Sequence, residues 1–226
     1  MEKVVEYSRY AFKTIYYRKI GIFSMTDTPS NETMWAYYTG NEGFCLEFDV
    51  DKFPFRTDGP FPINYQKEIG SVSTRTYGLD VAALVQTNVK KDCWSNENEW
   101  RLIVHAPEGF DLMSFGEDSD RYNRIDAIER KFRYPLDALK SITIMQQFFR
   151  NKLMCVKSVG GLDLEVRCLD GNSKQAKLLD FLSNLQVRTD VKTYCLIDVG
   201  NGNYVRREIS VIKTQQLLYR ILELND

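Results

Sequence analysis

Hydrophobic and polar residues repeat with strand and helix periods along most of the chain, and these periods predict its elements. Residues 43–51 alternate most cleanly, with Phe44 and Leu46 on one face and Cys45 and Glu47 on the other. Further short strands are predicted at 19–25, where the strand should be buried, and at 63–65, 141–145 and 162–168. Apolar residues at helical spacing predict helices at 2–17, 79–91, 121–134, 146–153 and 174–185.

Turn and cap residues separate these elements. Thr28 supplies a cap hydroxyl and Pro29 suits the first helical position, so a short helix is predicted from there to Gly40. The prolines within 53–62 predict a loop or an edge strand. The run Gly200-Asn201-Gly202-Asn203 is typical of a β-hairpin.

The alternation of short strands with helices favours an α+β fold with a mixed, largely antiparallel sheet and helices packed on it. Residues 1–159 are predicted to form the main α+β domain, and residues 160–226 a C-terminal α/β extension. Gly160-Gly161 marks the boundary. The alternative is that both parts belong to one domain. A polar loop is expected at 107–120.

The stretch from Trp94 to His105 predicts a strand that is entered by two acidic residues. Because side chains alternate across a strand, Glu97, Glu99 and Arg101 should share a polar face that is open to a ligand. Trp100 belongs to the opposite, mostly apolar face, which should pack on a core. The alternative is a surface strand whose carboxylates pair with neighbouring basic residues. Just before it, Lys90-Lys91 would suit the C-terminus of the helix at 79–91.

The composition excludes some classes of protein but does not indicate a function. The chain has 226 residues, 43% of them hydrophobic and 27% charged, which is ordinary for a globular protein, and a net charge of -1 makes no case for general nucleic-acid affinity. The five cysteines contain no Cys-x-x-Cys, which argues against a disulfide framework and a zinc site. His105 is the only histidine. Without a signal peptide or a membrane-spanning apolar run, the expected location is cytoplasmic, with no membrane partner.

Two further groups of residues could carry chemistry. Ser24 ends a predicted strand and could position a ribose, while Trp35 and Tyr38 could stack on a base or a nicotinamide ring. The alternative is that Ser24 helps to end its strand and that the aromatic residues belong to the core.

Acidic residues at alternating positions form the other group. Glu47, Asp49 and Asp51 could hold a divalent cation as in a metal-dependent nuclease. The nuclease pattern also requires Glu-x-Lys, whereas this chain has Glu97-Asn98-Glu99. No metal ligand is therefore assigned.

Four sequence blocks resemble, in order and spacing, a widespread bacterial family known only as a domain of unknown function. The blocks are Ile22-Phe23-Ser24, MWAYY at 34–38, GFCLEFD at 43–49 and WxxExEWR at 94–101. Residues 135–142 match its later part loosely. The family name implies no activity.

The same pattern is similar to the ADP-ribosyltransferase fold. That resemblance implies NAD as the substrate, Glu99 beside the nicotinamide ribose, Glu97 as the acid that orients the acceptor, and Ser24 as the residue that positions the ribose. Trp35, Tyr38 and Arg101 would complete the cofactor site, with Arg101 able to hold Glu99 in place.

One residue of the ADP-ribosyltransferase site has no clear counterpart in this chain. Such enzymes carry an Arg or His on an early strand, and here only Arg9 or Arg18 could replace it. Either the site is built differently, or a partner chain completes it, or activity is absent.

The leading hypothesis is therefore an ADP-ribosyltransferase-like or NAD-consuming effector, in the setting of bacterial conflict or phage defence as a toxin or antiviral protein. The acceptor, whether protein, nucleic acid or small molecule, stays open. A non-catalytic binding or assembly module of the same fold is the alternative, and a metal-dependent nuclease the third.

Overall fold

The computed structural model describes residues 20–53, 57–70, 79–105 and 134–224. Contacts between residues divide the chain into unit 1, formed by Met1–Asp27 and Phe53–Tyr134, and unit 2, formed by Thr28–Lys52 and Pro135–Asp226. The predicted helices at 2–17 and 121–134 and the loop at 107–120 lie outside the described residues, apart from residue 134.

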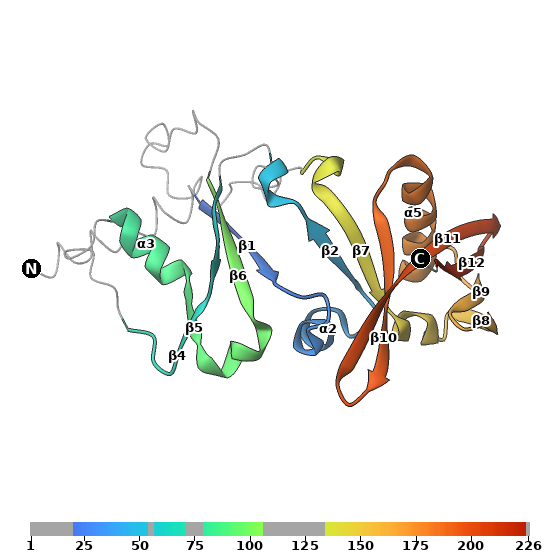
Figure 1. The fold of residues 1–226 in the computed structure, drawn as a ribbon, viewed down its shortest axis with the longest axis horizontal. Coiled ribbons are helices and arrows are strands. Elements are labelled where there is room, and N and C mark those ends of the chain that lie inside the picture. The colour runs from blue at the N-terminus through green and yellow to red at the C-terminus, as the bar shows by residue number, and fades with distance from the viewer. Residues whose placement is uncertain (1–19, 54–56, 71–78, 106–133, 225–226) are drawn as a thin grey trace, which may run out of the picture. The chain divides into compact units, whose positions relative to one another are not determined.

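Unit 1 is built on a three-stranded antiparallel sheet. Its strands, in spatial order, are β1 (Ile20–Thr26), β6 (Glu99–His105) and β3 (Thr57–Pro62), so the proline-rich stretch is an edge strand. The short strands β4 (Asn64–Gln66) and β5 (Val89–Lys91) pair in parallel, and α3 (Leu79–Thr87) lies between them in the sequence. Strands β1, β4, β5 and β6 and helix α3 are labelled in Figure 1.

Burial in unit 1 is concentrated on β6. Leu102, Ile103 and Val104 are all buried although they alternate between the two faces of the strand. Such a continuous apolar run is typical of a central strand, and β6 has a neighbour on both edges. The edge strand β1 differs from the prediction, because Ile22 and Phe23 are exposed rather than buried.

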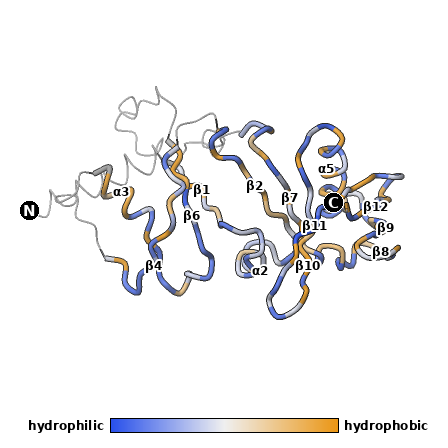
Figure 2. The backbone as a smooth tube through the Cα atoms, in the orientation of Figure 1, coloured by the Kyte–Doolittle hydropathy of each residue, from blue (hydrophilic) through white to orange (hydrophobic). Residues whose placement is uncertain are grey.

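Unit 2 contains a seven-stranded sheet in which only β7 and β10 pair in parallel. In spatial order its strands are β2 (Phe44–Phe48), β7 (Leu139–Met145), β10 (Lys192–Gly200), β11 (Asn203–Gln215), β12 (Leu218–Glu223), β9 (Asp163–Cys168) and β8 (Met154–Gly160). The predicted α+β class with a large, mostly antiparallel sheet is confirmed. The colours in Figure 2 change between hydrophobic and hydrophilic along these strands.

The helix α5 (Lys174–Arg188) covers one face of that sheet. Ser173 caps its first turn by accepting a hydrogen bond from the Ala176 amide. Its fully buried leucines Leu179 and Leu182 belong to the same apolar cluster as residues of β7, β9, β11 and β12. The amphipathic pattern predicted at 174–185 therefore identified the helix that closes the core of unit 2.

The short helix α2 (Glu32–Thr39) begins later than predicted. Its cap is Asn31, whose side chain accepts a hydrogen bond from the Met34 amide, whereas the Thr28 hydroxyl bonds Ser30. Gly40 ends the helix in the left-handed conformation at φ 59°, as predicted. The predicted hairpin is also confirmed, since 200–203 joins β10 to β11.

Two further element boundaries differ from the prediction. The helix at 79–91 ends at Thr87, and Lys90 belongs to β5. The strand at 43–51 ends at Phe48. In both cases the apolar spacing continued past the residue at which the element ends. Gly160-Gly161 is the turn of the β8–β9 hairpin, where both glycines have positive φ.

Candidate functional site

The acidic pair, Glu97 and Glu99, lies at the junction of two elements. Glu97 ends the 3₁₀ helix η2 (Asp92–Glu97), Asn98 adopts the left-handed conformation at φ 45°, and Glu99 begins β6. The two glutamates are therefore not successive members of one strand face. They are 1% and 4% exposed, which corrects the prediction of a face open to a ligand.

Basic side chains neutralise both glutamates. Lys90 Nζ lies 2.5 Å from Glu97 Oε2 and 3.0 Å from Glu99 Oε2, so one ammonium group bridges the pair. Arg101 Nε donates to Glu99 Oε1 over 2.8 Å, and the Arg101 guanidinium also donates to the Thr87 carbonyl. The carboxylates are therefore paired with basic neighbours, as the alternative interpretation predicted. That interpretation placed the pairs on the surface, whereas both glutamates are buried.

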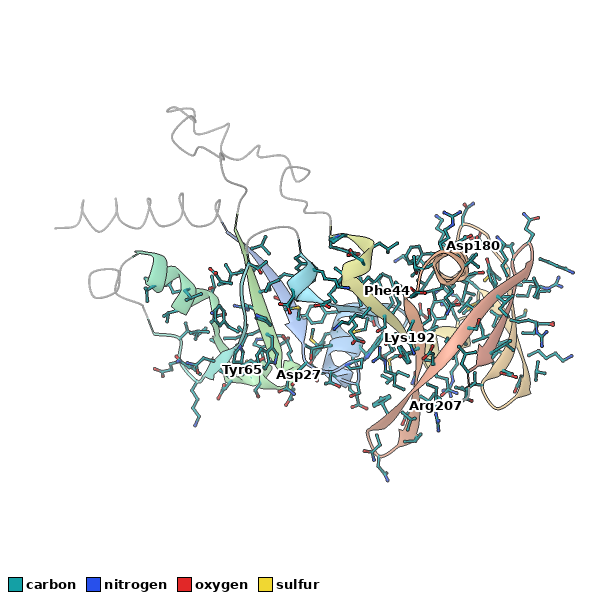
Figure 3. The ribbon with its side chains drawn as sticks, turned by 45° about the horizontal axis from the view of Figure 1, so that its top comes forward. Asp27, Phe44, Tyr65, Asp180, Lys192 and Arg207 are labelled. Carbon is teal, nitrogen blue, oxygen red and sulfur yellow. The ribbon has the colours of Figure 1, made fainter. Side chains whose placement is uncertain are left out.

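Two hydroxyl groups complete the surroundings of Glu99. Ser24 pairs with Arg101 in the register of β1 and β6, and its hydroxyl donates a hydrogen bond to the Glu99 carboxylate. Tyr65 of β4, labelled in Figure 3, accepts a hydrogen bond of 2.8 Å from the Glu99 amide. Side chain and main chain of Glu99 are therefore both held, by Ser24 of β1, Tyr65 of β4, Lys90 of β5 and Arg101 of β6.

Hydrogen bonds lower the pKa of Glu99 by more than burial raises it. Burial by itself raises the pKa of this carboxyl, but the donors Arg101, Ser24 and Lys90 lower the pKa from 4.5 to about 2. Burial also lowers the pKa of Lys90, yet its bonds to the acidic pair leave the pKa raised. Glu99 and Lys90 are consequently both charged at neutral pH.

This ionisation predicts a loss of stability in acid. Because the pKa of Glu99 is about 2 when folded and 4.5 without these contacts, the stabilisation is complete above pH 4.5 and disappears as the pH falls toward 2. One pKa unit corresponds to about 1.4 kcal/mol, so Glu99 contributes about 3 kcal/mol at neutral pH. Urea unfolding measured from pH 7 to 3 should show this slope in the wild type and a shallower one in Glu99→Gln. Equal slopes in the two proteins would contradict the assignment.

The structure brings four of the six predicted site residues together in unit 1: Ser24, Glu97, Glu99 and Arg101. Trp35 and Tyr38 lie on α2 in unit 2. Trp35 is 4% exposed, packs with Met145 and Leu196, and donates its indole N–H to the Pro29 carbonyl over 2.6 Å. It is a core residue, as the structural alternative proposed. Tyr38 is exposed.

Sequence reasoning missed Lys90 and Tyr65. Lys90 was assigned to the end of a helix because the apolar spacing of 79–91 continued past Thr87. Asn88, a residue type favoured just after a helix, was the available signal for an earlier end. No local pattern distinguishes Tyr65, whose role depends on the parallel pairing of β4 with β5.

The acidic residues of the nuclease alternative do not converge. Glu47 binds Ser141 and Arg206, over 2.6 and 2.9 Å, and these bonds hold its pKa below the usual range, although burial opposes them. Asp49 lies beyond the end of β2, with its carboxylate 3.7 Å from Lys140 Nζ, and Asp51 belongs to the 3₁₀ helix η1 (Val50–Lys52). Within the described ranges, no three His, Cys, Asp or Glu side chains are grouped so that they could hold a metal ion.

Fold and site together define an α+β protein with a buried, hydrogen-bonded pair of glutamates at the start of a strand. Residues 34–102, which include the acidic pair, match the family model described as Protein of unknown function (DUF2971). The predicted resemblance to a domain-of-unknown-function family is thereby confirmed. No curated protein and no solved structure matches the chain. None of the helices in the described part is long and apolar enough to cross a membrane.

Proposed function

We propose that this chain is an ADP-ribosyltransferase-like enzyme that uses NAD, with Glu99 as the residue that stabilises the ribosyl cation. The observation that carries the proposal is the placement of Ser24 beside Glu99: Ser24 pairs with Arg101 in the register of β1 and β6, and Arg101 Nε donates to Glu99 Oε1 over 2.8 Å. Ser24 and Glu99 come from neighbouring strands, β1 and β6, although they lie far apart in the sequence. They are the same two residues that the resemblance assigns to the ribose.

Cleavage of the bond between ribose and nicotinamide requires a charged carboxylate at a fixed position. When the bond between the ribose C1′ and the nicotinamide nitrogen breaks, positive charge develops on the ribose ring. A carboxylate held in place beforehand stabilises that charge without reorganising. Glu99 suits this role because its pKa of about 2 keeps it ionised, and because Ser24 and Arg101 fix its oxygens.

The neighbouring groups take the remaining roles. Glu97 accepts the proton of the acceptor nucleophile, and Arg101 holds Glu99. A protein or nucleic acid is the proposed acceptor, and a partner chain supplies the cation for the NAD phosphates that the early strand lacks. Bacterial conflict or phage defence, in the cytoplasm, is the proposed setting.

A second function is favoured by a different observation. Both glutamates are almost completely buried, and Lys90 and Arg101 balance their charges. Such a closed network is equally suited to holding β5 against β6 in a non-catalytic binding or assembly module. In that case no NAD chemistry occurs, and the acidic pair serves only the fold of unit 1.

Incubation with NAD separates the two functions. Wild-type protein, with and without cell lysate to provide an acceptor, should release nicotinamide that is measurable by mass spectrometry. Ser24→Ala removes a hydrogen bond to a charged group, which is worth about 1.5–3 kcal/mol, so release should fall about 10- to 100-fold. Ser158→Ala, at an exposed position on β8, is the matched control and should leave release unchanged.

Absence of nicotinamide release from the wild type both alone and with lysate, which supplies acceptor and partner chains, together with no thermal shift on adding NAD, would refute the enzyme and favour the binding module. A thermal shift with magnesium or manganese but not with NAD would instead favour the metal-dependent alternative.

A further inference from the structure

Lys90 contacts both members of the acidic pair, and nothing in its local sequence indicated this. We infer that Lys90 is a positioning residue of the proposed site, which allows Glu97 and Glu99 to be charged at the same time. The inference rests on the proposed function for its catalytic consequence. The ion pairs on which it depends stand independently of that function.

The geometry places two carboxylates on one nitrogen atom. Oε2 of Glu97 and Oε2 of Glu99 both accept from Lys90 Nζ, over 2.5 and 3.0 Å, and both side chains are less than 5% exposed. Two buried carboxylates at such a short separation repel each other. One of them therefore retains a proton unless a cation lies between them. Lys90 provides that cation.

The other described partners of Glu99 contact it by different bonds. Arg101, from β6, donates to Glu99 through Nε and Nη2. Ser24 of β1 and Tyr65 of β4 are neutral donors or acceptors for Glu99. Lys90 Nζ reaches Glu97 and Glu99 together.

Two features hold the Lys90 ammonium group at this position. Lys90 pairs with Tyr65 in the parallel register of β4 and β5, so its backbone is fixed beside a residue that also contacts Glu99. Its ammonium nitrogen lies 5.4 Å from the centre of the Trp94 ring, within the range of a cation–π interaction. The bridge is therefore built by β5, η2 and β6 together.

A simultaneous charge on both glutamates matters because the proposed reaction gives them different roles. Glu99 must be ionised to stabilise the ribosyl cation, and Glu97 must be ionised to accept a proton from the acceptor. If the pair shared a proton, one role would be lost at neutral pH. Lys90 thus sets the pH range in which the site could work.

The test compares Lys90→Met and Lys90→Gln with Lys90→Arg, which keeps the charge, and with Lys91→Met, which removes the exposed neighbouring lysine. Glutamate carboxyl carbons are titrated by ¹³C NMR, with Glu97→Gln and Glu99→Gln to assign the signals. Loss of the cation should raise the midpoint of at least one of the two carboxyls by about 1–3 pH units. Lys90→Arg and Lys91→Met should titrate as the wild type does. Lys90→Gln still donates hydrogen bonds and serves if Lys90→Met does not fold.

The same variants are then assayed for nicotinamide release against pH. Lys90→Met or Lys90→Gln should move the acidic limb of the release profile to higher pH by about the same amount as the carboxyl midpoints, whereas Lys90→Arg should keep the wild-type profile. Unchanged carboxyl midpoints in both neutral variants would overturn the inference about Lys90. A wild type that releases no nicotinamide would overturn the proposed function alone, because the NMR titration still decides whether Lys90 keeps both glutamates charged.

Discussion

Glu99→Gln is expected to lower nicotinamide release by about 10²–10³-fold, the usual cost of removing one preorganised group that stabilises charge in a transition state. Glutamine keeps the shape of the side chain and can still accept the Ser24 hydrogen bond, but it lacks the negative charge. The structure adds a second effect, because Glu99 is also the buried partner of Lys90 and Arg101. Its replacement should lower the free energy of unfolding by about 3 kcal/mol at pH 7.

The two effects are separated by measuring initial rates well below the melting temperature and stability by urea unfolding. Glu208→Gln is the matched control, because Glu208 forms an ion pair of 2.8 Å with the exposed Lys192. That surface pair should contribute less than about 1 kcal/mol, and its loss should not change release. A Glu99→Gln protein that remains folded and keeps the wild-type rate would show that the carboxylate has only a structural role.

Trp35→Ala is expected to lower the free energy of unfolding by about 3–5 kcal/mol, since it leaves a cavity where a large side chain was buried. Trp35 packs against Met145 and Leu196 at 4% exposure, with its indole N–H bonded to the Pro29 carbonyl. The more conservative Trp35→Phe keeps much of the apolar contact and loses the hydrogen bond, which costs about 1 kcal/mol. Chemical denaturation followed by circular dichroism measures both.

Tyr37→Ala is the control on the same helix, because Tyr37 is 71% exposed, and it should change stability by less than about 0.5 kcal/mol. The comparison also tests whether Trp35 stacks on a cofactor. If Trp35→Phe abolished nicotinamide release while its stability stayed close to that of the wild type, the ring would act on NAD rather than in the core.

Trp100 shows how far a strand pattern predicts burial. Alternation assigned Trp100 to an apolar face that packs on a core, yet it is only half-buried, whereas the neighbouring Leu102 and Ile103 are fully buried on opposite faces. Period alone describes which residues share a face. It does not describe what covers that face, which depends on the strands and loops that lie beside it.

The sequence by itself determined the elements whose signals are local. Alternation identified the strands β2 and β7, helical spacing identified α5, and the glycines at 200–203 identified the β10–β11 hairpin. These signals act within one turn or one strand, because backbone preferences and side-chain direction are set by neighbouring residues. For the same reason the sequence alone could select Glu99 and Ser24 as candidates.

Only the tertiary structure decided what surrounds those candidates. The parallel pairing of β4 with β5 brings Lys90 and Tyr65 to Glu99, and the left-handed Asn98 removes Glu97 from the strand. The acidic pair is therefore buried and bridged rather than open. Charges cannot be buried singly at low cost, so the position of one lysine decides whether two adjacent glutamates can both be ionised. The position of that lysine depends on the pairing of β4 with β5, which are separated in the sequence. Patterns among neighbouring residues cannot predict such a pairing.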